Sequence, residues 1–512
     1  MLKYKIMEGM ERKLPASIDY SAVLPMSVPA ESRRRKFYPV NGGTFTSTGN
    51  SEIRIPISST NALLDAAHSY LTFTLTNNNA GATFSPDLGG AAMMFSRVRV
   101  EQQGKVLSDT NEYNRLVASV INPVSETRDG RLAATIRDLT RAGNFPGVPN
   151  TTPGAAGTYR GDKAAFACHN SPLMIDNTAA AANGSGSFTF TMPLITGLFT
   201  QDKLIPLPLV DKNNPLTIVL TMDAVENMGV FAGVAPAAGS LSITAISYNA
   251  QLVEVGPDVI SQFAMMRDMM GGQLALSGHD WEHNSAFLEG DAAGGGGERI
   301  VPIPMRKRSI KSLFWVANSS DLANTAGPLA GLHLVYNKSF GGTCNISSYQ
   351  LKVGSVVYPP TAIAGPGQAV LARSQTRRGE CLMELCKAMG TLSFSAPSGA
   401  LLNTLTYMAD QGSAVGATTA DGDNGDGLGA TLVPDGADAA CVCPFGLDLE
   451  AFQHTALESG VDTETLALQS NLILNIDPLA GTIGLESKTI HSWICYDKHY
   501  YFNQDGSVSF SD

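Results

Sequence analysis

The chain has 512 residues, a formal net charge of −11 and only 16% charged residues. Its length excludes a single domain and predicts two large ones, because one hydrophobic core stops growing at roughly 250–300 residues. The charged fraction lies below the usual ~25%, so we expect neighbouring molecules to cover much of the surface. Residues 1–36 hold eight Lys/Arg against four Asp/Glu. The acidic remainder therefore excludes nucleic-acid binding over most of the surface.

Export signals and membrane spans are not expected. Residues 1–10 lack the apolar run of a secretory signal peptide, which predicts synthesis in the cytoplasm or nucleus rather than secretion. The seven cysteines are odd in number and irregularly spaced, so we expect reduced, buried thiols instead of a disulfide framework. The longest uncharged apolar stretch, Ala388–Ala409, is interrupted by Gly, Pro, Ser, Thr and Asn. It does not qualify as a membrane span.

Residues 1–36 are expected to form an extended basic arm. Three prolines interrupt any helix in this segment. The arm ends in four consecutive basic residues, Arg33, Arg34, Arg35 and Lys36. Such a cluster is either a solvated linker or a contact site for a partner.

Alternation of apolar and polar residues predicts strands through most of the first half. Residues 69–76 are the clearest case, with Leu71 and Phe73 on one face. The other strands expected here are Ser51–Ile57, Arg97–Glu101, Ser187–Met192, Leu216–Met222 and Leu241–Val255. This half is therefore strand-rich, and its expected helices are few and short.

Three helices are predicted from capping signals and apolar spacing. They are Asp109–Val120, a segment near Arg128–Ala142, and Val259–Met270. Asp109 or Thr110 would cap the first. Pro257 just inside the start and Gly271 just past the end fit a capped third helix. We therefore place a linker helix at 257–272, between a first unit at 37–256 and a second at 273–512.

The second unit is again predicted to be mostly strand. Its expected strands are Leu274–Leu276, Glu298–Ile303, Ile310–Ala317, Gly331–Tyr336, Ser348–Tyr358, Thr391–Ser395, Leu466–Ile476 and Lys488–Tyr496. Residues 409–440 are rich in Gly, Asp, Ala and Thr, with little to bury, and predict a long loop. Within that loop, Asp421–Gly427 is similar to a calcium loop. Asp426 and Leu432 stand where an EF-hand needs Gly and Glu, so a flexible acidic loop is favoured over weak divalent binding.

The two units resemble one another in sequence. Gly104 and Gly354 each close a strand-and-turn segment and lie 250 residues apart. Six short segments match in the same order with offsets of 243 to 254, and the first members begin at Glu52, Ser69, Arg97, Pro193, Thr217 and Ile246. A period this long indicates a duplicated domain rather than a solenoid. The expected fold is all-β, with two tandem eight-stranded jelly-roll sandwiches, few short helices and long loops.

Short motifs in both units point to a known family. They are Asp65–Leu71, Arg97–Leu107, Asn111–Leu116, Ser348–Gly354, Tyr358–Pro360, Gly446–Glu450, Ser459–Thr463, Tyr496-Asp497 and Asp505–Val508. In this order and spacing, the chain resembles the double jelly-roll major capsid proteins of double-stranded DNA viruses. The likeness is greatest to those of polinton-like viruses and virophages.

The resemblance implies a homotrimer whose six jelly rolls form a pseudo-hexagonal capsomer in an icosahedral shell. It implies residence in the virion, with neighbouring capsomers, penton proteins and minor capsid proteins as partners. It implies no cofactor, catalytic residue or small-molecule substrate. Arg33, Arg34, Arg35 and Lys36 would then lie on the inner surface or between capsomers, within reach of the genome or an internal membrane.

Two other functions are compatible with parts of the sequence. A tandem sandwich that binds glycans at a cell surface has the same fold class, although the absent signal peptide disfavours it. His279-Asp280-Trp281-Glu282-His283 matches the H-x-x-E-H pattern of some zinc peptidases, which would make the chain a zinc hydrolase. That chemistry needs both imidazoles on one helix face, and the strand-rich surroundings favour a structural role instead.

Overall fold

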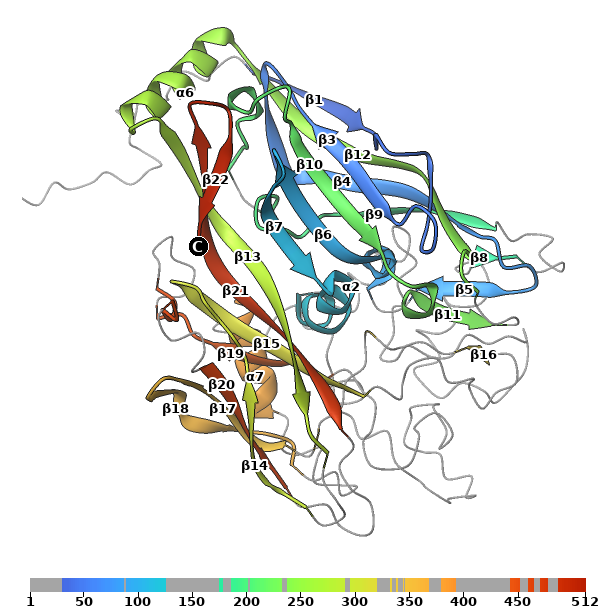
Figure 1. Cartoon of the computed structure of the whole chain (residues 1–512), viewed down its shortest axis with the longest axis vertical. Coiled ribbons are helices and arrows are strands. Elements are labelled where there is room, and N and C mark those ends of the chain that lie inside the picture. The colour runs from blue at the N-terminus through green and yellow to red at the C-terminus, as the bar shows by residue number, and fades with distance from the viewer. Residues whose placement is uncertain are drawn as a thin grey trace, which may run out of the picture.

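In the described residues of the computed structural model, strands make up most of the regular secondary structure. The described residues are 30–86, 89–125, 175–177, 186–200, 203–232, 237–290, 295–319, 332–333, 338, 344, 346–367, 379–392, 443–451, 459–464, 470–477 and 487–512. They form two β-sandwiches, the first from the N-terminal half and the second from the C-terminal half (Figure 1). The predicted all-β class and the division into two sandwiches are confirmed.

The first sandwich has two antiparallel sheets. One sheet has the order β1 (Ala30–Phe37), β12 (Leu241–Val255), β4 (Ala62–Asn77) and β9 (Ser187–Met192), with β2 (Thr44–Thr46) also on β12. The other has the order β3 (Glu52–Ile57), β10 (Leu216–Met222), β6 (Phe95–Gln102) and β7 (Lys105–Asn111). Side chains alternate across a strand, so every second residue points into the space between the sheets.

Phe73 shows how the first core joins its two sheets. Its ring on β4 meets Phe95 on β6 edge-on, with ring centroids 5.4 Å apart, and it stacks on Phe190 of β9. All three side chains are fully buried. Burying a side chain of this size stabilises the fold by about 1.5–3 kcal/mol, so this cluster fixes the spacing of the sheets.

The second sandwich repeats this plan. One sheet has the order β13 (Gln273–Leu288), β21 (Lys488–Asn503), β15 (Ile310–Ser319) and β19 (Phe445–Asp448), with β22 (Val508–Ser511) also on β21. The other has the order β14 (Gly297–Pro302), β20 (Ser470–Ile476), β17 (Ile346–Val353) and β18 (Val356–Ala364). Trp315 on β15 meets Tyr349 on β17 edge-on and stacks on Phe445. An aromatic side chain thus spans this core as well.

The duplication inferred from the sequence is visible in the pairing of strands. β3, β10, β6 and β7 stand in the same order as β14, β20, β17 and β18. Leu220 lies opposite Ile53, and its counterpart Leu474 lies opposite Arg299, the residue that matches Ile53. Five of the six matched segments fall on equivalent strands. The sixth does not, because Pro193 follows β9 whereas Pro444 precedes β19.

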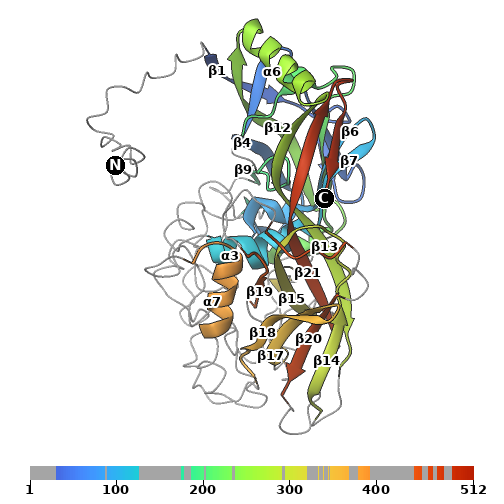
Figure 2. The same cartoon turned by 90° about the vertical axis from the view of Figure 1, so that its left-hand side faces the viewer.

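Among the described residues, a fifth sheet takes strands from both halves, and two longer helices accompany the sandwiches. The sheet has the order β16 (Leu332–His333), β11 (Gly229–Ala232), β5 (Thr83–Pro86) and β8 (Ile175–Asp176). Helix α6 (Pro257–Met269) lies between the last strand of the first sandwich and the first strand of the second, and it has no buried residue. Helix α7 (Gly379–Ala388), which the sequence analysis missed, packs beside the second sandwich (Figure 2).

The helix predicted over Asp109–Val120 begins later than expected. Strand β7 continues to Asn111 because Asp109 forms an ion pair with Arg97 across the β6–β7 hairpin. The chain then turns at Glu112 in a left-handed conformation, with φ 49°. Helix α2 (Tyr113–Arg115), the π-helical turn η2 (Leu116–Ile121) and α3 (Asn122–Ser125) follow. The proposed caps at Asp109 and Thr110 are therefore wrong.

Other differences concern strand lengths and regions outside the description. β13 extends to Leu288, twelve residues beyond the predicted end, and the segment predicted as Ser348–Tyr358 is two strands joined by a turn at Gly354. The helix near Arg128–Ala142 and the loop at 409–440 lie outside the described residues. Of Gly331–Tyr336, Thr391–Ser395 and Leu466–Ile476, the description covers residues 332–333, 391–392 and 470–476.

Candidate functional site: the junction between the two halves

The four basic residues singled out in the sequence lie on strand β1, at the edge of the first sandwich. Arg34 donates to Asn249 Oδ1 at 2.9 Å and lies over the ring of Tyr70. Arg33 forms ion pairs with Glu31 and Glu254. Residues 30–36 therefore belong to a sheet rather than to a free arm, whereas residues 1–29 lie outside the description. Exposed charges on an edge strand also discourage unwanted strand pairing.

The H-x-x-E-H residues lie on a strand, not on a helix. His279 and His283 are both on β13, and four residues of strand separate Cα atoms by about 13 Å. His279 lies 3.1 Å from Asp497, whereas His283 lies 3.0 Å from His491. The two imidazoles thus have different partners. Across the described ranges, no group of three His, Cys, Asp or Glu side chains is arranged to hold a metal ion.

Several cysteines behave as buried thiols. Cys381 and Cys386 on α7 are buried, as is Cys443, and Cys495 lies on β21. Burial raises the pKa of the Cys381 and Cys495 thiols to about 12. They remain protonated at neutral pH and are poor nucleophiles. Cys381 and Cys386 are free and buried, as expected for these two cysteines, and Cys441 lies outside the described residues.

Polar side chains instead gather where the two sandwiches meet. Figure 1 shows β13 of the second half running alongside β7 of the first, and β22 also contacts β7. Asp280 on β13 is the clearest example, since only 1% of its surface is exposed. It accepts hydrogen bonds from Ser108 Oγ at 2.7 Å and from Gly197 N at 3.2 Å, both in the first half. Its second oxygen accepts one from Lys498 Nζ at 3.0 Å.

The close fit around Asp280 depends on Gly197. A Cβ atom at this position would lie 2.3 Å from Tyr500 Oη and 2.6 Å from Asp280 Cγ. Any larger residue would therefore push the halves apart. The Asp280–Lys498 pair lies within the second half, and removing one partner of such a buried pair typically costs about 3–5 kcal/mol. Lys498 therefore holds the Asp280 carboxylate in place, and the bonds of that carboxylate to Ser108 and Gly197 align the two halves.

Gln102 forms a second contact across the junction. Its Nε2 donates to the carbonyl of Gly506 at 2.8 Å, and its Oε1 accepts from the backbone of Val508 at 2.5 Å. Gln102 is buried at the end of β6. Its reciprocal amide bonds hold the β21–β22 hairpin of the second half against the first.

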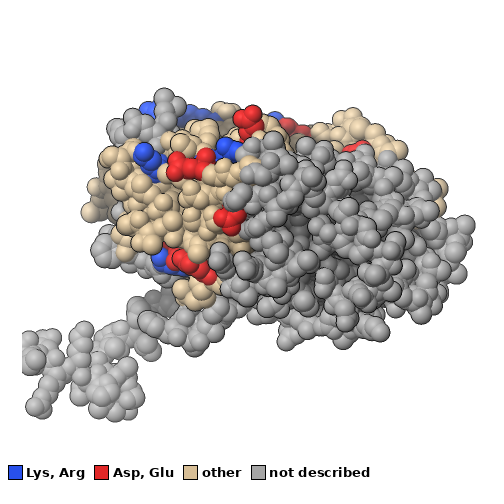
Figure 3. All heavy atoms as spheres, turned by 90° about the horizontal axis from the view of Figure 1, so that it is seen from below, with Lys and Arg blue, Asp and Glu red and all other residues tan. Residues whose placement is uncertain are grey.

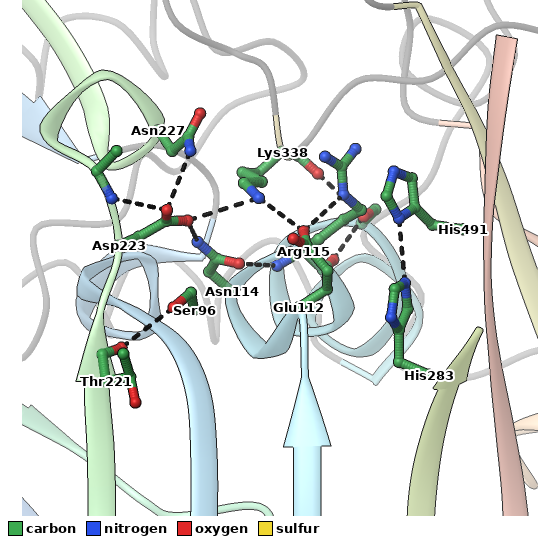
Figure 4. A network of polar contacts seen from close by, with 12 residues as sticks. Ser96, Glu112, Asn114, Arg115, Thr221, Asp223, Asn227, His283, Lys338 and His491 are labelled. Carbon is green, nitrogen blue, oxygen red and sulfur yellow. Dashed lines mark hydrogen bonds and ion pairs between the residues drawn. The ribbon is translucent and has the colours of Figure 1, made fainter. Parts of the chain in front are cut away.

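Lys338, from the second half, enters a buried acidic cluster of the first half (Figure 4). Its Nζ lies 2.6 Å from Glu112 Oε2 and 3.5 Å from Asp223 Oδ2. Glu112 also pairs with Arg115 at 3.2 Å. Burial would raise the pKa of Glu112, but the charges of Lys338 and Arg115 outweigh it and hold that pKa at about 2. Glu112 is therefore ionised at neutral pH.

Two histidines from the second half complete this part of the junction. His283 Nε2 lies 3.0 Å from His491 Nδ1, the rings are stacked with centroids 5.3 Å apart, and Trp493 packs beside His283. Burial lowers the pKa of His283 to about 4 and that of His491 to about 2. Both imidazoles are neutral at neutral pH and are packed as structural groups.

These contacts orient one half against the other; they do not assemble nucleophiles, general bases or metal ligands. Asp280, Gln102 and Lys338 are not among the site residues predicted from the sequence. The one sequence signal near these residues was the H-x-x-E-H pattern, which lies on β13 with Asp280 but suggested zinc binding instead of a structural contact.

On the described part of the face in Figure 3, basic and acidic side chains occur in mixed groups and do not form a continuous basic patch. Within the same described ranges, no helix has the length and apolarity to cross a membrane.

The structure of the chain is similar to known structures, although its sequence is not similar to known families. No family model matches the sequence, and no curated protein sequence matches it either. The structure is similar to PBCV-1 VP54 in a crystal structure fitted into a reconstruction of the virophage Sputnik, with TM-score 0.53, 10% identity and coverage of 96% of this chain and 99% of that one. It is also similar to a chain of a PBCV-1 virus capsid model, with TM-score 0.51, 9% identity and coverage of 96% and 99%.

A third similar structure is that of the Sputnik virophage determined by cryo-electron microscopy. Its TM-score is 0.51 at 9% identity, and the match covers 98% of this chain and 92% of that one. These likenesses run through both sandwiches and confirm at the level of fold the resemblance seen in the sequence. The chain has the double jelly-roll fold of viral capsid proteins.

Proposed function

We propose that the chain is the major structural unit of an icosahedral viral shell, acting as a homotrimer whose six jelly rolls form a pseudo-hexagonal capsomer. The observation that carries this proposal is the repeated strand order of the two sandwiches, together with the buried junction that holds them in one alignment. Three chains with two similar sandwiches each would place six similar sandwiches around the threefold axis. The role is structural rather than enzymatic, and it requires no cofactor or small-molecule substrate.

Closed threefold symmetry lets one sequence bury the same surface three times. Obligate interfaces of this kind commonly exceed about 2,000 Å² and are apolar at their centre. The chain exposes suitable groups at α6, where Met265 and Met269 are 64% and 88% exposed, and on β14, where Ile300 is 61% exposed. We assign these surfaces to contacts within and between capsomers.

The proposed location is the virion, with neighbouring capsomers, penton proteins and minor capsid proteins as partners. We further propose that the N-terminal segment, with Arg33, Arg34, Arg35 and Lys36, lies at the inner surface or between capsomers and contacts genome or internal membrane. Because residues 30–36 pair with β12, a clean test deletes only residues 1–29. A second variant replaces Arg33, Arg35 and Lys36 with glutamine. Trimers should persist while shells fail to form, and normal shells from both variants would contradict this assignment.

Size-exclusion chromatography with light scattering tests the oligomer. The proposal expects a mass of three times 53.9 kDa and no stable monomer. A monodisperse monomer at all concentrations would contradict it and would favour a glycan-binding tandem sandwich. Measuring the zinc content of the same sample tests whether the chain is a zinc hydrolase. Stoichiometric zinc in the wild type that is lost in a His283→Ala variant would favour the enzyme.

A further inference from the structure

The stacked histidines are placed where a change of charge would act on the junction. His283 on β13 and His491 on β21 face Arg115 of the first half, beside Glu112 and Lys338 (Figure 4). The side chain of Arg115 is only 4% exposed, and that of Lys338 is 6% exposed. Water therefore has little access to screen these charges.

The contact between the rings requires a particular protonation state. A hydrogen bond between two ring nitrogens needs one N–H donor and one bare nitrogen acceptor, so at least one ring must be neutral. If both rings are protonated, two donors face one another at 3.0 Å. The nearby positive charges of Arg115 and Lys338 add to the repulsion. Glu112 offers the one opposing carboxylate among the described neighbours, and it already pairs with both cations.

Separation of the halves would relieve this repulsion by admitting water to the imidazoles. The groups that repel one another come from both sides of the junction, because Arg115 belongs to the first half and the histidines to the second. We propose that the His283–His491 pair is an acid-sensitive switch that loosens the contact of β13 and β21 with the α2–η2 segment when the rings take up protons. The proposal concerns the single chain and does not depend on the capsomer.

The direction of the effect follows from proton linkage. An imidazole exposed to water has a pKa of 6.5, whereas burial, followed by the charges of Glu112, Arg115 and Lys338, sets the pKa of His283 at about 4. The open junction therefore binds protons more readily than the closed one. The closed state keeps its full stability above pH 6.5 and loses it as the pH falls towards 4. For His283 alone, the opening constant should rise ~30-fold between pH 7.5 and pH 5.

Hydrogen exchange of the full-length protein tests the switch. Peptides covering residues 105–125 are compared with the core strands β4 and β10 at pH 7.5 and pH 5, after correction for intrinsic exchange rates. In the wild type, which carries both histidines, opening at residues 105–125 should rise at least ~30-fold while the core strands change little. In a His283→Gln, His491→Gln double variant the rise should fall below ~3-fold. His68→Gln, which alters an exposed histidine paired with Asp65, should behave as the wild type.

Two outcomes would overturn the proposal: an equal response to pH in the wild type and the double variant, or a uniform rise in exchange throughout the chain. If the double variant does not fold, NMR of histidine-labelled wild type decides the matter. Two rings that stay neutral at pH 5.5 support the switch. Ordinary titration of every histidine near pH 6.5 contradicts it.

Discussion

The two sandwiches carry equivalent sheets with different outer faces. On the β3–β10–β6–β7 sheet, arginines and acidic residues form a network of ion pairs across neighbouring strands. Its members are Arg54, Arg97, Arg99, Glu52, Glu101 and Asp109. On the β14–β20–β17–β18 sheet, the outward positions that match Arg54 and Val219 hold Ile300 and Ile473. Ile300, which is 61% exposed, thus stands where the first half has the charge of Arg54, whereas Ile473 replaces a valine that is itself buried.

The inward faces did not diverge in this way. Ile55 and Leu220 in the first half and their counterparts Val301 and Leu474 in the second are all buried. The exception is Ile53, whose counterpart is the half-buried Arg299. Alternating burial is therefore what preserves the sandwich, whereas the outer face is free to change. The charges of the first half satisfy one another, and the apolar groups of the second half remain available to a neighbouring molecule. Inward-facing residues therefore hold each half together, whereas we assign the exposed outward-facing residues of the second half to assembly.

The largest expected effect comes from the two cores, where the halves should behave alike. Phe73→Ala and Trp315→Ala each remove an aromatic side chain that reaches the opposite sheet. Each should lower the free energy of unfolding by about 3–5 kcal/mol, because a cavity adds to the lost burial. Denaturant titration measures this loss, with Thr74→Ala on the outer face as control. A loss below about 1 kcal/mol in one half alone would break the equivalence of the cores.

Substitutions at the junction between the two halves should have the next largest effect on stability. Asp280→Ala leaves Lys498 buried without its nearest carboxylate and should cost about 3 kcal/mol. Thermal unfolding should then split into two transitions as the halves uncouple. Glu31→Ala, which removes an exposed ion pair with Arg33, is the control and should leave the midpoint unchanged. An unaltered single transition for Asp280→Ala would show that other contacts align the halves.

The outer faces should show the smallest effects on the stability of the chain. Arg99→Ala removes ion pairs to Glu52 and Glu101 and should cost at most about 1 kcal/mol, less at high salt, because such pairs are partly solvated. Ile300→Asp should leave the stability of the monomer nearly unchanged but reduce the trimer fraction measured by light scattering. If Arg99→Ala weakens the trimer more than Ile300→Asp does, our assignment of the two faces is reversed.

Strands with one buried face could be predicted from the sequence. Ser187–Met192, Leu216–Met222 and Leu241–Val255 were placed with their observed bounds, because apolar and polar residues alternate along much of their length. β13 was cut short at Leu276 because its later residues are mostly polar. Pairing with β21 keeps them in the strand, and among residues 277–288 only Asp280 and Leu288 are buried, so the sequence of the strand carries no periodic pattern.

The candidate site was much harder to predict. Asp280 and Ser108 are 172 residues apart, and Glu112 and Lys338 are 226 residues apart. Contacts of this kind arise only after both sandwiches have formed and docked. The H-x-x-E-H segment matches a zinc-peptidase motif in residue pattern, but that motif binds zinc only when the segment is a helix. On a strand, His283 turns towards His491 and not towards His279.

Electron microscopy of the purified full-length protein tests the central claim most directly. We expect single particles with threefold symmetry and a nearly hexagonal outline, in which six lobes correspond to three pairs of jelly rolls. Particles that show only two lobes at every concentration would contradict the proposal that this duplicated chain is a capsomer unit.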